Sequence, residues 1–97
     1  MESLSFNTTD LFSATIQQPA QLESLANGAL SRGIDLYMRQ DFEGAVKEFR
    51  RSVGLAPNSA YSTDASEYMA RAYLALDDTD GAVKAYEDAL KRNPNRD

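Results

Sequence analysis

An acidic run in the second half of the chain carries residue types that could bind a cation. It is made of Asp77, Asp78, Asp80, Gly81 and, further along, Glu87. The spacing is close to that of a calcium-binding loop between two helices, but Leu76 stands where the first oxygen ligand must be. We therefore expect no metal site, and interpret the run as a turn whose carboxylate caps the following helix.

The groups that most enzymes use for catalysis are missing or isolated. The chain has no histidine and no cysteine, which excludes imidazole bases, thiolate nucleophiles and the two commonest zinc ligands. Asp35, Glu43 and Glu48 lie among basic residues and are typical of solvated helix faces. No phosphate-binding glycine loop and no nucleophile elbow occurs. We expect neither an enzyme nor a cofactor.

Composition narrows the possible partners. The net charge is −5 and the isoelectric point is about 4.6, which disfavours nucleic acid because phosphate binding needs clustered lysine and arginine. No run approaches the ~18 to 20 apolar residues that span a bilayer, and the N-terminus lacks the basic and apolar stretch of a secretory signal. We expect a soluble, cytoplasmic protein that does not bind membranes.

The elements that position these residues are predicted to be four helices. Apolar residues recur at spacings of three and four over residues 20–40, 42–53 and 61–76. Asp41 is expected to cap the second helix, and Gly54 and Pro57 to end it. The fourth helix should begin at Asp78 or Thr79 and end before Asn93-Pro94. An all-α arrangement of antiparallel helices follows.

Residues 1–19 precede these helices and form a predicted N-terminal arm without lysine or arginine. The arm is expected either to be disordered or to dock on a groove or on a partner. Its large apolar residues are candidates for such contacts: Leu4, Phe6, Leu11, Phe12 and Ile16. Because exposed side chains of this kind promote aggregation, we expect them to be buried in the same subunit or in a neighbouring one.

A repeat occupies the remainder of the chain, residues 20–97. Gly44-Ala45-Val46-Lys47 recurs 37 positions later as Gly81-Ala82-Val83-Lys84, and Pro57-Asn58 recurs as Pro94-Asn95. The two copies cover about residues 26–59 and 63–96. Each places small residues in two successive helices, then an aromatic residue and a proline: Gly33, Ala45, Phe49 and Pro57 in the first copy, and Ala70, Ala82, Tyr86 and Pro94 in the second.

This pattern resembles the tetratricopeptide repeat, in which small residues let two antiparallel helices approach closely. The resemblance implies an all-α helical repeat, a fragment of a right-handed α-solenoid made of two helix-turn-helix units. The spacing of 37 exceeds the family's usual value of about 34. The extra residues between Pro57 and Ala70 should lengthen either the connection between repeats or the third helix.

In this family the first helix of each repeat lines a concave groove. The resemblance therefore implies a partner-binding set made of Asn27, Leu30, Ile34, Tyr37, Met38, Asp64, Glu67, Arg71 and Leu74. Leu30, Ile34 and Met38 also form a separate stripe by spacing alone, which fits either core packing or contact with a ligand. Such a groove favours an amphipathic helix or an extended apolar peptide.

The predicted function is protein–protein interaction through this groove. Burying a continuous core usually takes about three repeats, and this chain has two. The open end of the repeat pair must therefore be covered. The alternatives are a self-assembling scaffold, forming a homo-oligomer through the arm and the uncapped repeat ends, or a fragment of a longer array of repeats.

Overall fold

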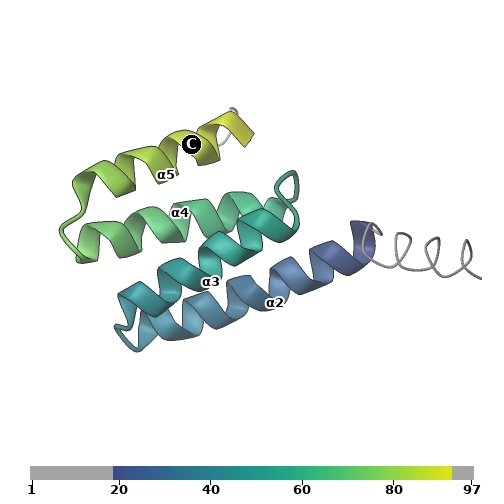
Figure 1. The fold of residues 1–97 in the computed structure, drawn as a ribbon, viewed down its shortest axis with the longest axis horizontal. Helices are drawn as coiled ribbons and strands as arrows, with labels where there is room; N and C mark the ends of the chain where they lie inside the picture. The colour runs from purple at the N-terminus through teal and green to yellow at the C-terminus, as the bar shows by residue number, and fades with distance from the viewer. Residues whose placement is uncertain (1–18, 93–97) are drawn as a thin grey trace, which may run out of the picture.

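The computed structural model describes residues 19–92, and every regular element in this range is helical. The helices are α2 (Pro19–Met38), α3 (Phe42–Leu55), α4 (Ala60–Ala75) and α5 (Thr79–Arg92). Consecutive helices are antiparallel and lie side by side, from α2 at the bottom of Figure 1 to α5 at the top. The predicted all-α helical repeat is confirmed.

The first turn is two residues longer than the sequence predicts. Helix α2 ends at Met38, two residues before the expected end, because Gln40 adopts a left-handed backbone conformation with φ of 68°. The Asp41 N–H then donates to the Leu36 carbonyl at 2.8 Å, which closes the end of the helix. The chain thereby reverses direction within three residues.

Helix α3 begins with the predicted cap and ends later than predicted. The Asp41 carboxylate accepts a hydrogen bond from the Gly44 N–H at 3.0 Å. Gly54 lies inside the helix, which continues to Leu55. The prediction that Gly54 ends α3 is wrong, because the helix stops only where Pro57 constrains the residue before it.

The extra residues between the repeats lengthen a helix and leave the connection short. Helix α4 already begins at Ala60, after the Ser59 hydroxyl has accepted a hydrogen bond from the Ser62 N–H at 3.2 Å. Only residues 56–59 connect α3 to α4. The short connection keeps the two helix pairs in direct contact.

The turn between α4 and α5 repeats the first turn, 37 positions later. Asp77 has φ of 61°, like Gln40, and the Asp78 N–H donates to the Tyr73 carbonyl at 2.8 Å. The Gly81 N–H donates to the Asp78 carboxylate at 2.9 Å. The sequence repeat is therefore also a repeat of turn geometry and capping.

The core lies where small residues bring the helices together. Ala45, Ala70 and Ala82 are buried, as the repeat pattern predicts. Inside the first helix pair the Ser52 hydroxyl donates to the Ala26 carbonyl at 2.8 Å, in a buried position. Close helix contacts leave room for few large side chains, and Phe49 is the largest residue that is fully buried.

Candidate interaction face

Helices α2 and α4 pack against each other and run in the same direction, both ending on the left of Figure 1. The predicted binding residues come from equivalent positions on these two helices. We call the surface that they form the α2/α4 face, which is made of Asn27, Ile34, Tyr37 and Met38 from α2 and of Asp64, Glu67, Arg71 and Leu74 from α4.

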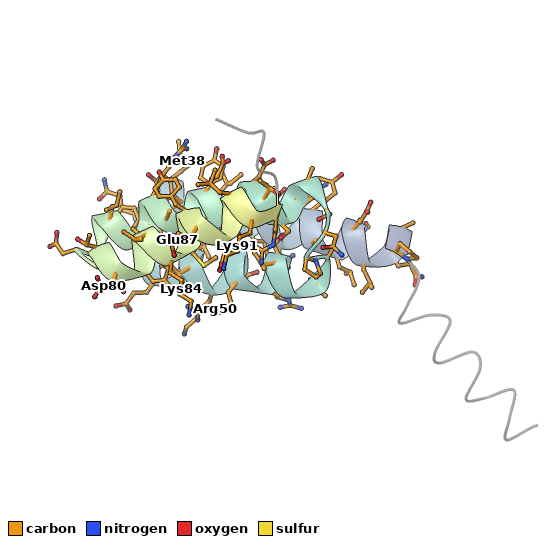
Figure 2. All side chains as sticks on the ribbon, turned by 90° about the horizontal axis from the view of Figure 1, so that it is seen from above. Met38, Arg50, Asp80, Lys84, Glu87 and Lys91 are labelled. Carbon is orange, nitrogen blue, oxygen red and sulfur yellow. The ribbon has the colours of Figure 1, made fainter. Side chains whose placement is uncertain are left out.

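The C-terminal ends of both helices expose large apolar side chains on this face. Met38 is 74% exposed and Leu74 is 50% exposed. In Figure 2, Met38 projects from one edge of the molecule, whereas Arg50 and Lys84 project from the opposite edge. Met38 therefore lies away from the side where α3 and α5 present these basic groups.

An aromatic chain joins the α2/α4 face to the core. The Tyr37 ring lies edge-on to Phe42 at 5.4 Å and to Tyr68 at 6.0 Å, measured between ring centroids. Tyr68 in turn stacks on Phe49 at 5.6 Å. Because these rings come from α2, α3 and α4, they hold the two halves of the face in a fixed relation.

Sequence reasoning missed Tyr68, the central ring of this chain. Its equivalent in the first repeat is Ser31, so comparison of the two repeats gave no signal for an aromatic residue. The Arg71 guanidinium lies over the Tyr68 ring, 5.1 Å from its centroid. This cation–π contact places a positive charge beside the apolar end of the face.

The remaining predicted residues differ in exposure. Leu30 belongs to the buried core and is only 7% exposed, whereas Ile34 is partly buried against that core. Asn27 is exposed, and Asp64 and Glu67 are half-buried. The stripe of Leu30, Ile34 and Met38 thus runs from the core to the surface along one helix, and Leu30 supports the face from beneath.

The predicted arm contacts Leu4, Phe6, Leu11, Phe12 and Ile16 lie outside the described residues. Two hollows are lined by described residues away from the α2/α4 face. One, of about 200 Å³, lies between the start of α2 and the α3–α4 connection, at Leu22 and Pro57. The other, of about 220 Å³, lies between α3, α4 and α5, at Arg50 and Lys84.

The acidic run lies at the turn before α5, and Asp78 caps that helix through the Gly81 N–H. Among residues 19–92 no group of three or more acidic side chains is arranged to hold a metal ion. None of the helices between Pro19 and Arg92 is both long enough and apolar enough to cross a membrane.

Comparison with known proteins finds a family match for the second helix pair. Residues 63–97 match the family model described as the tetratricopeptide repeat. No curated protein matches the chain. The matched segment contains most of α4 and all of α5.

Proposed function

We propose that this chain, of which residues 63–97 match the tetratricopeptide repeat family, binds a peptide segment of a partner protein through the α2/α4 face. Proteins of this family generally serve protein–protein interaction and are generally not enzymes. The partner segment is an amphipathic helix or an extended peptide that presents large apolar side chains.

The observation that carries this proposal is the exposure of Met38 and Leu74 at the same end of adjacent helices. Large apolar side chains that are exposed together favour burial against a partner. Tyr37 lies next to Met38 in the chain and is held between Phe42 and Tyr68. Burying Met38 and Leu74 would stabilise a complex by about 1.5 to 3 kcal/mol for each side chain.

The charged residues of the face favour one orientation of the ligand. Arg71 lies over Tyr68 near the apolar end, whereas Asp64 and Glu67 lie nearer the start of α4. The face thus has an apolar part, a positive part and a negative part. A matching peptide would place apolar side chains over Met38 and Leu74, an acidic group near Arg71 and a basic group toward Asp64. Opposite charges at these places select the binding register.

Selection from a displayed library of random peptides tests this proposal. The wild-type chain should enrich peptides that carry at least two large apolar residues. Binding of an enriched peptide should weaken about tenfold in Met38→Ser and again in Leu74→Ser, since each substitution removes apolar contact area.

Leu25→Ser is the matched control for this experiment. Leu25 is 55% exposed and lies on α2, outside the α2/α4 face. The control should bind the enriched peptide as wild type does. Equal affinities in wild type and in the Met38→Ser, Leu74→Ser double variant would overturn the proposal.

Self-association is a second candidate function. It is favoured by a separate observation, the exposed apolar side chains of Val83, Tyr86 and Leu90 on α5. These residues lie on the second helix of the second repeat, so the two candidates use different surfaces and are independent of each other.

A further inference from the structure

The outer side of α5 carries an apolar stripe made of Val83, Tyr86 and Leu90, which are 50%, 41% and 52% exposed. Each of these residues lies 37 positions after a residue of α3: Val46, Phe49 and Val53. The α3 stripe is covered, with Val46 and Phe49 buried and Val53 partly buried. The α5 stripe is thus the exposed copy of a surface that elsewhere in this chain packs against a helix.

Helix α4 shows what such a stripe requires from its partner. The Tyr68 ring stacks on Phe49, and Ala65, Met69 and Ala72 are buried in the same cluster. A helix that covers the α5 stripe must therefore bring apolar or small side chains and run antiparallel to α5, as α4 does to α3.

Helix α2 of a second copy does not meet this requirement. Its residues at the positions equivalent to Ala65, Tyr68, Met69 and Ala72 are Gly28, Ser31, Arg32 and Asp35. Arg32 is moreover paired with Glu48 at 3.2 Å. Head-to-tail stacking of copies would bury these polar and charged groups against an apolar stripe, which is unfavourable.

Helix α5 of a second copy does meet the requirement, because its own outer stripe is apolar. Its charged residues also fit those of a second α5 that runs in the opposite direction. Asp80, Lys84, Glu87 and Lys91 follow one another beside the apolar stripe, with alternating sign. In Figure 2 Asp80, Glu87 and Lys91 lie along α5, with Lys84 toward the edge that Arg50 shares. When the helix is reversed about its middle, Asp80 faces Lys91 and Lys84 faces Glu87.

We propose that the chain forms a symmetric dimer in which α5 packs antiparallel against α5 of a second copy, about a two-fold axis close to Tyr86. With the axis between Ala85 and Tyr86, Val83 lies about 3 Å along the helices from Leu90 of the second copy, and Tyr86 lies about 1.5 Å from its own counterpart. The apolar stripes cover each other, and four ion pairs flank them on one side. The α2/α4 face remains available to a peptide.

Sedimentation equilibrium of the full 97-residue chain over a range of concentrations tests the dimer. Wild type should approach twice the monomer mass, and Leu90→Lys should remain a monomer with unchanged helical content, because Leu90 is exposed. Leu25→Lys, which changes an equally exposed leucine on α2, should dimerise as wild type does. A monomeric wild type would overturn the proposal and leave the stripe to another segment of the chain or to a different protein.

Disulfide trapping tests the register, since the chain has no cysteine of its own. Two copies of residue 87 would be offset by about 5 Å along the helix axes, but two copies of residue 91 by about 16 Å. Under mild oxidation Glu87→Cys should therefore form a linked dimer and Lys91→Cys should not. A mixture of Asp80→Cys and Lys91→Cys chains should form the mixed dimer. Efficient linkage of Lys91→Cys to itself would overturn the proposed register.

Discussion

Gly33 of α2 lies directly against the Phe49 ring of α3: a β-carbon at Gly33 would fall 2.5 Å from the nearest ring atom. The ring has little freedom to move, because Phe49 is fully buried and stacked on Tyr68. We predict that Gly33→Ala destabilises the fold by about 1 to 3 kcal/mol, as overpacking does in other cores. Urea denaturation would measure the loss.

Gly54→Ala is the control for this prediction, since a β-carbon at Gly54 meets nothing within 4 Å. Gly54 lies inside α3, where alanine should stabilise the helix by about 0.5 to 1 kcal/mol. If both substitutions changed the denaturation midpoint in the same direction, the close approach of the Phe49 ring would not explain why residue 33 is a glycine.

Ala45 and Ala82 occupy equivalent positions in the two helix pairs, and both are buried. Ala45→Leu and Ala82→Leu should each destabilise the fold by about 1 to 3 kcal/mol, because the larger side chain forces the paired backbones apart. The loss should be greater for Ala45, whose neighbour Phe49 is covered by α4, than for Ala82, whose neighbour Tyr86 is 41% exposed. Unchanged midpoints in both variants would contradict the packing account.

Gln40 and Asp77 hold the left-handed conformation at the ends of α2 and α4. Gln40→Gly should raise the stability by about 1 kcal/mol, because glycine adopts this conformation without a steric penalty. The gain for Asp77→Gly should be smaller, since aspartate tolerates the same conformation better. Thermal unfolding of the two variants would check the order, and a lower Tm for Gln40→Gly would contradict it.

Asp78 caps α5 through the Gly81 N–H, and this role accounts for the acidic run without a metal. Asp78→Ala should destabilise the protein by about 1 kcal/mol through loss of the cap. The Tm of wild type and of Asp80→Asn should not change when calcium is added. A Tm that rises with calcium in wild type but not in Asp80→Asn would show that the run binds the ion.

Much of the fold could be predicted from the sequence repeat. Ala45, Ala82 and the cap at Asp41 follow from residue types that recur 37 positions apart, because local chemistry decides close helix contacts and capping. Helix ends were less predictable. Gln40 has no strong preference for the left-handed conformation that ends α2, and only the hydrogen bonds of the turn impose it.

The stripe of Leu30, Ile34 and Met38 was predictable from the sequence, but the burial of each residue along it was not. Helical spacing places Leu30 and Met38 on one stripe, yet their exposures of 7% and 74% depend on which neighbouring helix covers each end. Tyr68 could not be inferred from Ser31 in the other repeat. Its role comes from contacts with Tyr37 and Phe49, which only the packing of three helices creates.

The most direct test of the central claim is an NMR titration of the ¹⁵N-labelled chain with a peptide enriched by display. Partner binding through the α2/α4 face predicts that the largest amide shifts cluster at residues 34–38 and 67–75, on the C-terminal halves of α2 and α4. Residues 83–90, on the α5 stripe, should stay unchanged. Shifts concentrated on α5, or on the hollow beside Arg50 and Lys84, would contradict the claim.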